Sequence, residues 1–341
     1  MDAGYPSVSI VLPFRNASDT IDEALRSVMR QSLPDWELLA IDDGSTDASA
    51  AIVTAIGDPR VRLLRNPRPG LVNALNLGLG ESRAALIARM DSDDIMRPRR
   101  LQKQFEAMRS EPALCLCASQ VRLFPDAHIR AGYRAYIDWQ NTLLHPEQID
   151  AAMFTESPFV HPSVMFRRDH ILAAGGYRHG DFPEDYELWL RLRAGGAQMR
   201  KLPGILLDWR DGPQRLSRTD PRCRRAAFDR IKLDYLMRDP RLLARREHFV
   251  CWGAGRKTRR RSDPLLANGF RPRVWIDIDS RKIGNRIDGI PVVSPDWLRE
   301  HREHLVLSWI SNHGARAGLQ AFFSQNGLRE GRDYLMLAGY T

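Results

Sequence analysis

Short apolar runs recur along the first part of the chain, and most of them stop at proline or at an acidic pair. They cover residues 8–12, 36–41, 61–64, 84–90 and 114–121. Runs of this length, rich in branched residues and bounded by polar positions, are typical of buried strands. Five strands are therefore expected before residue 122.

The segments between these runs have helical spacing. Thr20 and Glu23 stand at the positions of a capping box, and Pro98 suits the first turn of a later helix. Strands that alternate with helices predict a parallel α/β sheet with helices on both faces. Ligands of such sheets bind beyond the carboxyl ends of the strands.

Acidic residues follow two of the predicted strands at this edge. Asp42 and Asp43 end the second strand, and ARMDSDD places Asp91 and Asp93 after the fourth. Asp91 and Asp93 are two residues apart, so in extended chain they point the same way. Paired carboxylates suit Mg²⁺ or Mn²⁺, which also bind substrate phosphates. The alternative is that Asp93 or Asp94 caps the helix near Pro98.

A second acidic pair opens a later helix. Residues 183–193 have helical spacing, which puts Glu184 and Asp185 in the first turn. Acids are favoured there by the helix dipole alone, so a structural and a catalytic interpretation both stand. His161 likewise has two interpretations, a contact with sugar or a histidine satisfied within its loop.

Four segments together carry a family resemblance. SVSIVLPFRN, IDDGSTD, ARMDSDD and PEDYELWLRL stand in the order and at the gaps of the inverting family 2 glycosyltransferases of the GT-A fold, which residues 6–220 resemble. The resemblance implies a nucleotide-sugar donor, most often UDP-linked, and Mn²⁺ or Mg²⁺. It also implies a glycan or lipid-linked acceptor in polysaccharide biosynthesis at the cell envelope.

The same resemblance assigns roles to individual positions. Asp185 matches the catalytic base, with Glu184 as a supporting acid, and Asp91 and Asp93 match the metal pair. The donor nucleotide is expected to contact Pro13, Arg15, Asp42 or Asp43, and the helix that carries Asn73 and Asn76.

Two departures from the family pattern concern the diphosphate. Leu75 stands where many members carry arginine, and Gly212 stands where many carry a histidine near the metal. Arg210 and Arg215 are shaped to bind phosphate and are candidates to replace them. The alternative is that these arginines form ion pairs with Asp208 or Asp211.

The C-terminal part predicts a different unit. Residues 1–237 form the expected transferase domain, 238–247 a charged linker, and 248–341 a small Rossmann-like α/β domain. Thr258 replaces the third glycine of a dinucleotide fingerprint that begins at Gly253, so NAD binding has weak support. A structural or partner-docking role, a second ligand site and a redox enzyme all remain open.

Charge and length limit the partners. The chain has 341 residues and a net charge of +9. No nucleic-acid motif accompanies the arginines, so nucleic acid is not expected, whereas peripheral contact with an anionic membrane is compatible with them. A signal peptide and a membrane-spanning run are not recognised, which predicts a cytoplasmic chain at the inner face of the membrane. The oligomeric state is left open.

Two other functions compete with sugar transfer. A nucleotidyltransferase would need a glycine-rich basic loop after the first strand, and the segment there, PFRNASD, is not one. A non-catalytic sugar-nucleotide sensor would need no base at Asp185.

Overall fold

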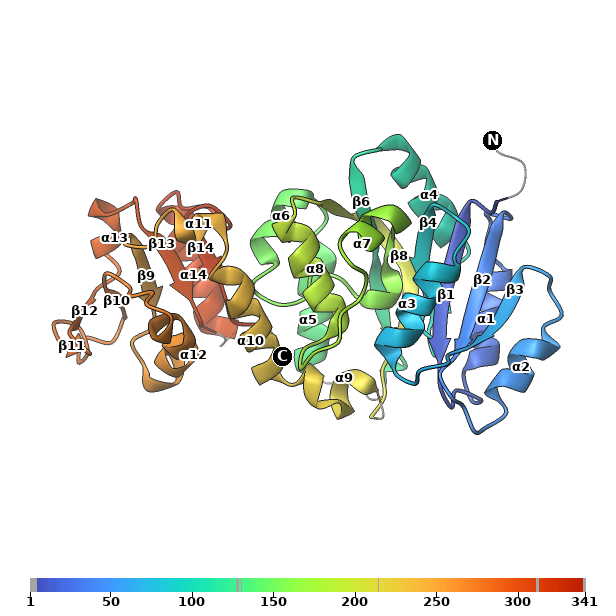
Figure 1. The fold of residues 1–341 in the computed structure, drawn as a ribbon. Helices are drawn as coiled ribbons and strands as arrows, with labels where there is room; N and C mark the ends of the chain where they lie inside the picture. Colours follow the sequence, from blue (N-terminus) through green and yellow to red (C-terminus); the bar gives the residue numbers. More distant parts are fainter. Residues whose placement is uncertain (1–4, 127–128, 130, 214, 311–312, 340–341) are drawn as a thin grey trace. The chain divides into compact units, whose positions relative to one another are not determined.

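A computed structural model describes residues 5–126, 129, 131–213, 215–310 and 313–339. It divides into two compact units, of which the first comprises residues 1–146 and 159–220 and the second residues 147–158 and 221–341. Each unit is built around its own sheet (Figure 1). Within the described residues, every helix is too short or too polar to cross a membrane.

The sheet of the first unit has eight strands in the order β3-β2-β1-β4-β7-β6-β8-β5. Their bounds are β1 Val8–Phe14, β2 Trp36–Asp42, β3 Val61–Arg65, β4 Leu86–Arg89, β5 Ile95–Met96, β6 Leu114–Phe124, β7 Met165–Arg167 and β8 Gln198–Arg210. Strands β1 to β4 are parallel, β7 runs antiparallel between β4 and β6, and β5 is antiparallel to β8. The predicted parallel α/β sheet is confirmed, with an antiparallel part that the apolar runs did not predict.

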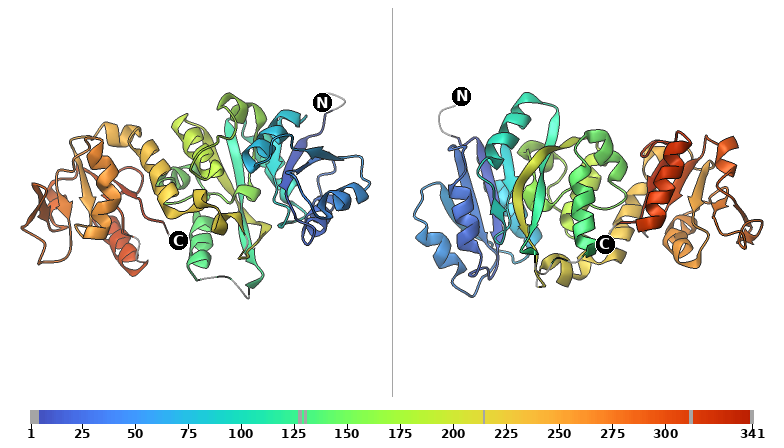
Figure 2. Two further views of the ribbon diagram at one scale, coloured as in Figure 1. Left: turned by 60° about the horizontal axis from the view of Figure 1, so that its bottom comes forward. Right: turned by 180° about the vertical axis from the view of Figure 1, so that it is seen from behind.

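Helices cover both faces of this sheet, and Figures 1 and 2 show α1 and α3 on opposite faces. The helices of the unit are α1 Ile21–Met29, α2 Ser49–Ala55, α3 Leu71–Glu81, α4 Arg100–Ser110, α5 Ala131–Thr142, α7 Arg168–Ala173, α8 Glu184–Ala194 and α9 Leu216–Thr219. The capping box predicted at Thr20 is wrong, because its side chain makes no cap bond to the helix. Its hydroxyl instead lies 3.5 Å from the carbonyl of Ala17.

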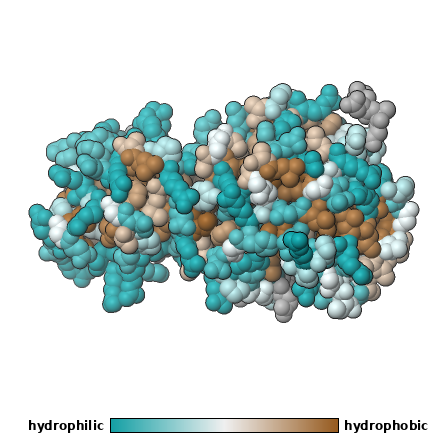
Figure 3. Space-filling view, in the orientation of Figure 1, coloured by the Kyte–Doolittle hydropathy of each residue, from teal (hydrophilic) through white to brown (hydrophobic). Residues whose placement is uncertain are grey.

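Strands β1 and β2 are buried along their whole length, as expected for parallel strands covered on both faces. Helix α3 approaches them closely because it has glycine at position 78, where a Cβ atom would lie 2.5 Å from Val11 and 2.9 Å from Ile41. On edge strand β3, Leu63 is 39% exposed, and Figure 3 shows hydrophobic residues at the surface over this edge. The close approach of α3 fixes its first turn beside the carboxyl ends of β1 and β2.

The second unit has six strands in the order β11-β12-β10-β9-β13-β14. They are β9 Phe249–Trp252, β10 Trp275–Ile276, β11 Arg286–Ile287, β12 Ile290–Val293, β13 Leu305–Ser308 and β14 Tyr334–Met336. All pairings are parallel except that of β11 with β12. Taken in chain order, the five parallel strands stand 3-2-1-4-5, which is a doubly wound arrangement.

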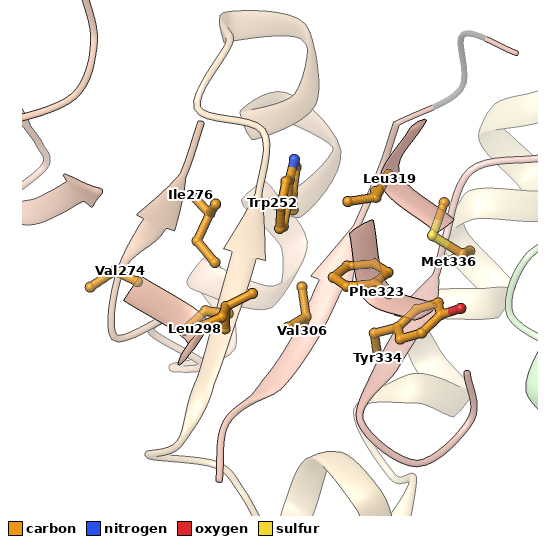
Figure 4. Packing of buried hydrophobic residues seen from close by; sticks show 10 residues of the cluster. Trp252, Val274, Ile276, Leu298, Val306, Leu319, Phe323, Tyr334 and Met336 are labelled. Atoms are coloured by element: carbon orange, nitrogen blue, oxygen red, sulfur yellow. The ribbon is translucent and has the colours of Figure 1, made fainter. Parts of the chain in front are cut away.

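Helices and a compact core complete this unit. The helices are α6 Pro146–Ala152, α10 Arg225–Leu236, α11 Pro240–Leu243, α12 Arg256–Ala267, α13 Trp297–Glu300 and α14 His313–Gln325. Figure 4 shows the apolar side chains between sheet and helices, where the rings of Phe323 and Tyr334 stack at 4.0 Å.

A segment from the first half of the chain joins the second unit. The hydroxyl of Thr155 donates to the carbonyl of Met336 at 2.6 Å, and Arg241 pairs with Asp150 at 3.0 Å. The units therefore divide the chain differently from the predicted domains 1–237 and 248–341, whose limits stay a prediction.

Candidate active site

The carboxyl ends of β1, β2 and β4 meet at one edge of the first sheet. The register places Phe14 opposite Asp42, and Met90 continues from β4 by donating to the carbonyl of Val11 at 3.0 Å. The loop after β1 is tied to the loop after β2, because the Asn16 side chain accepts a bond from the backbone N–H of Thr46 at 2.8 Å. This edge is where the sequence predicted a ligand.

The predicted nucleotide side of the edge contains two buried acids. Asp42 accepts the backbone N–H of Ser45 at 2.8 Å, so it closes the turn after β2. Asp43 accepts the Gly70 N–H at 2.8 Å and the Asn66 side-chain N–H at 2.6 Å, which holds the turn before α3. Each acid is thus fixed by the turn that it stabilises.

Two further predicted nucleotide contacts lie at the end of β1. Pro13 is buried within the strand, and Arg15 is exposed just beyond it. Of these two residues, only Arg15 therefore has an exposed side chain that a nucleotide could contact.

Three carboxylates cluster after β4. One oxygen from each of Asp91, Asp93 and Asp94 lies within 4.8 Å of the other two. Neither Asp93 nor Asp94 caps α4, whose N-cap residue is Arg99, so the capping alternative is wrong. One Asp94 oxygen accepts the Arg210 backbone N–H at 2.8 Å, and the other is buried without a hydrogen-bond partner in the described part of the chain.

The electrostatics of this acidic cluster fit a cation. Burial first, and then the charge of Asp91, raise the pKa of Asp93 to about 6. Burial, and then the charges of Asp91 and Asp93, raise the pKa of Asp94 well above its ordinary value. Three hard oxygen donors that crowd one another and leave one oxygen unpartnered are a suitable set for Mg²⁺ or Mn²⁺.

Arg89 is a residue of the site that the motif analysis did not single out. Its side chain is buried and pairs with Asp91. Burial opposes its charge, but Asp91 and its neighbours outweigh that effect, and the pKa of the guanidinium lies above its usual value. The signal was present in the sequence, since a charged residue inside a buried strand needs a partner.

The two predicted phosphate-binding arginines have different surroundings. Arg210 donates to the backbone carbonyl of Asp93 at 2.6 Å and pairs with Glu23, so its guanidinium supports the loop of the acidic cluster. Arg215 lies 3.9 Å over the Trp209 ring and donates to the Tyr133 hydroxyl at 3.0 Å.

The charge of Arg215 is coupled to the acidic cluster. Burial opposes that charge, but Tyr133 and then Asp94, Asp93 and Asp91 hold the pKa of Arg215 above its usual value. Arg215 also pairs with Asp211 at 3.9 Å, which agrees with the alternative interpretation of this arginine.

Glu184 and Asp185 open helix α8, as predicted. One oxygen of Asp185 accepts the backbone N–H of Tyr186 at 2.7 Å. Burial, and then the charge of Glu184, raise the pKa of Asp185 to about 7, while Arg89 acts in the opposite direction. Arg89 therefore acts on both acidic groups, which stand far apart in the sequence.

The two predicted asparagines of α3 hold a loop. Asn76 donates to the Tyr177 carbonyl at 2.9 Å and accepts the Tyr177 N–H at 2.9 Å. Asn73 meets the His179 ring at 3.0 Å. Asn76 thus positions Tyr177. The Tyr177 hydroxyl lies 2.8 Å from Nε2 of buried His161. His161 is therefore hydrogen-bonded within the protein, as the second interpretation expected.

Comparison with known proteins agrees with this geometry. The model of the glycosyl transferase family 2 matches residues 9–173. The amylovoran biosynthesis glycosyltransferase AmsE of Erwinia amylovora is 34% identical over 209 residues, which cover 60% of this chain and 76% of that protein. An Escherichia coli UDP-Gal:alpha-D-GlcNAc-diphosphoundecaprenol beta-1,3-galactosyltransferase is 28% identical over 60% of this chain and 73% of its own length.

Solved structures show the same fold at low sequence identity. The mannosyltransferase PcManGT of Pyrobaculum calidifontis, in complex with GDP-Man and Mn²⁺, has a TM-score of 0.54 at 19% identity and covers 70% of this chain and 66% of its own. Residues 1–349 of S. aureus TarS, in complex with UDP-GlcNAc, have a TM-score of 0.53 at 13% identity and cover 77% of this chain and 80% of that one. The chain therefore belongs to glycosyltransferase family 2, and its first unit has the GT-A fold that the sequence resemblance predicted.

Proposed function

We propose that this glycosyltransferase moves a sugar from a UDP-linked donor to a glycan or lipid-linked acceptor with inversion, and that Asp185 is its general base. The observation that carries the proposal is the acidic cluster after β4, in which one oxygen from each of Asp91, Asp93 and Asp94 lies within 4.8 Å of the other two. Buried Arg89 pairs with Asp91, and its charge also lowers the pKa of Asp185. A cluster suited to a metal ion that binds a diphosphate and a carboxylate suited to proton transfer thus share one charged neighbour.

The donor nucleotide would lie over the carboxyl ends of β1 and β2. Asp42, Asp43 and Arg15 would face the nucleoside, and Asp43 is held rigidly by its two bonds to the turn before α3. UDP is favoured because the E. coli relative is named for UDP-Gal and a structural neighbour was solved with UDP-GlcNAc. GDP remains the competing nucleotide, because another neighbour was solved with GDP-Man.

The diphosphate would lie at the acidic cluster. Asp91 and Asp93, with Asp94 beside them, would hold Mn²⁺ or Mg²⁺, which supplies positive charge to the leaving nucleoside diphosphate. Arg215 adds a second cation on this side, because its charge is already coupled to these acids. Arg210 holds the backbone of Asp93 in place.

Asp185 would remove the proton of the acceptor hydroxyl. A base must be ionised and must bind the acceptor hydroxyl during attack, and a pKa of about 7 lets Asp185 take up the proton near neutral pH. Attack from the face opposite the leaving group inverts the configuration at the anomeric carbon. Glu184 tunes this pKa by its charge and is not itself the base.

The test is a donor screen on the purified chain with a lipid-linked glycan acceptor. Release of UDP from a UDP-sugar, dependent on Mn²⁺ and lost in Asp185→Asn, is the expected result. Pyrophosphate release from UTP and a sugar phosphate would instead identify a nucleotidyltransferase. Donor binding without any turnover, equal in wild type and Asp185→Asn, would identify a sugar-nucleotide sensor.

The proposal also covers where the chain acts and what residues 248–341 do. A lipid-linked acceptor would place the chain at the cytoplasmic face of a membrane, where its net charge of +9 is attracted to anionic lipid. Residues 248–341 would act as a Rossmann-like accessory domain. Sedimentation with anionic and with neutral vesicles separates peripheral binding from none.

A further inference from the structure

Histidines gather at the amino-terminal edge of the sheet in the second unit. His248 stands directly before β9, and His304 directly before β13. These strands pair in parallel, with Leu305 opposite Phe249, and the Leu305 N–H donates to the His248 carbonyl at 2.9 Å. Paired strands are about 4.8 Å apart, so the sheet itself brings the two histidines side by side.

A carboxylate completes the group. The rings of His248 and His304 lie 5.4 Å apart, and Glu303 approaches His304 Nδ1 at 3.0 Å. One ligand atom from each of the three residues lies within 4.8 Å of the other two. Two imidazoles and one carboxylate are a donor set that zinc uses with a water molecule in the fourth position.

Neighbouring groups orient the buried histidine. His304 Nδ1 faces the His301 carbonyl at 3.3 Å as well as the Glu303 carboxylate. Without an ion, Nδ1 donates its proton to these acceptors. A bound ion would take the place of that proton on Nδ1, which lies 3.0 Å from the Glu303 carboxylate and so within the separation of two ligands of one ion.

One wall of the group is aromatic and the other is open. The ring of Trp297 stacks on His301 at 3.8 Å and meets the edge of His304 at 4.9 Å. His248 and Glu303 are exposed, whereas His304 is only 6% exposed. An ion can therefore reach two of its ligands from solvent and meet a third that is rigidly held.

We propose that His248, Glu303 and His304 bind a divalent transition-metal ion of the zinc type, at a site separate from the acidic cluster of the first unit. Zinc bonds of about 2.0–2.1 Å place tetrahedral ligands about 3.4 Å apart, so small side-chain rotations from the observed spacing suffice. The acidic cluster offers only hard oxygen ligands and suits Mg²⁺ or Mn²⁺. The imidazoles select a softer ion.

The position of this site indicates that a bound ion would stabilise the second unit. Ligands of parallel sheets bind beyond the carboxyl ends of the strands, and this site lies at the opposite edge. An ion here joins β9 to β13 through their leading residues. Because the unfolded chain cannot bring His248 and His304 together, binding stabilises the folded second unit.

Calorimetry of the full chain with Zn²⁺, in excess Mg²⁺ to fill the acidic cluster, tests the proposal. One Zn²⁺ per chain is expected. His248→Ala and Glu303→Gln each weaken that binding by at least about tenfold, the loss seen when even outer partners of a metal site are removed. His301→Ala is the matched control, since it removes a neighbouring imidazole but keeps the carbonyl that faces His304, and it leaves the affinity nearly unchanged.

Hydrogen exchange provides a second measurement that does not depend on enzyme activity. Zn²⁺ should slow exchange in β9 and β13 of the wild type and leave the His248→Ala chain unaffected. Binding that survives both His248→Ala and Glu303→Gln overturns the site. Binding that is lost instead in Asp91→Asn assigns the ion to the acidic cluster and also overturns it. Because His248 and Glu303 are exposed, their variants are expected to fold, and circular dichroism checks this.

Discussion

Glu184→Gln is the most informative perturbation of the proposed mechanism. Glu184 and Asp185 are adjacent at the start of α8, and the charge of Glu184 is the second cause, after burial, of the raised pKa of Asp185. Glutamine keeps nearly the same shape and removes the charge. The pKa of Asp185 should then fall below its present value of about 7 but stay above its ordinary value, because burial remains.

The size of the shift can be estimated from charge repulsion. Two unit charges about 6 Å apart in a medium of effective dielectric constant about 20 repel by about 2.8 kcal/mol, which equals about two pKa units. At pH 6, the ionised fraction of a base then rises from about one tenth at pKa 7 to about nine tenths at pKa 5. The rate at pH 6 should therefore rise about tenfold in Glu184→Gln.

The assay is the pH dependence of kcat/KM for UDP release, because this quantity reports the free enzyme's essential base. Wild type should lose activity as pH falls through about 7, since protonation removes the basic oxygen of Asp185. Glu184→Gln should keep the same plateau at alkaline pH and lose activity about two pH units lower. Asp185→Asn should lose about 10²-fold or more at every pH, with donor affinity nearly retained.

Two results would refute this reasoning. An unchanged inflection in Glu184→Gln would mean that the charge of Glu184 does not reach the base. A dead Glu184→Gln beside an active Asp185→Asn would mean that the base is Glu184. Calorimetric titration of donor with each folded variant separates loss of chemistry from loss of binding.

Three further predictions concern neighbouring groups. Asp93→Asn should abolish metal-dependent binding of a UDP-sugar, and EDTA should do the same to wild type; unchanged calorimetry in EDTA would contradict this. Asn76→Ala removes both bonds to the Tyr177 backbone and should lower the free energy of unfolding by about 2 kcal/mol in urea titrations; no change would contradict its positioning role. The folded pKa of Asp185 is raised, so the stability that its protonation supplies is lost as pH rises through about 7. Asp185→Asn should therefore be more stabilising at pH 8 than at pH 5, by about 2–3 kcal/mol, and an equal effect at both pH values would contradict the raised pKa.

The sequence predicted the parallel part of the first sheet because buried parallel strands are continuous apolar runs. It placed Asp42, Asp43, Asp91 and Asp93 at the correct edge for the same reason, since each follows directly on such a run. It did not predict β5 Ile95–Met96 and β7 Met165–Arg167, because strands of two and three residues leave no period to detect. Their pairing is set by distant partners in the sheet.

Contacts between distant residues also decided the parts of the site that the sequence did not foresee. Asn76 resembles a nucleotide ligand by its position, but its amide binds the backbone of Tyr177, 101 positions later. Arg210 resembles a phosphate ligand, but its guanidinium binds the backbone of Asp93, 117 positions earlier. Side chains with several donors can form hydrogen bonds to protein or to substrate, and only the fold shows which partner lies within reach.

The charge arrangement at this edge is not explained by stability. Burial raises the pKa of Asp93, Asp94 and Asp185, so each carboxylate is held in a place that disfavours its ionised form. Buried Arg89 compensates only in part, and a buried ion pair is on its own weak support for a fold. Well-packed apolar residues in place of buried charges are often equally or more stabilising. Groups with raised pKa values after β4 and at the start of α8, both influenced by the charge of Arg89, are instead expected where a ligand supplies the missing charge. The neighbourhood of Arg89 is therefore where donor and acceptor should meet.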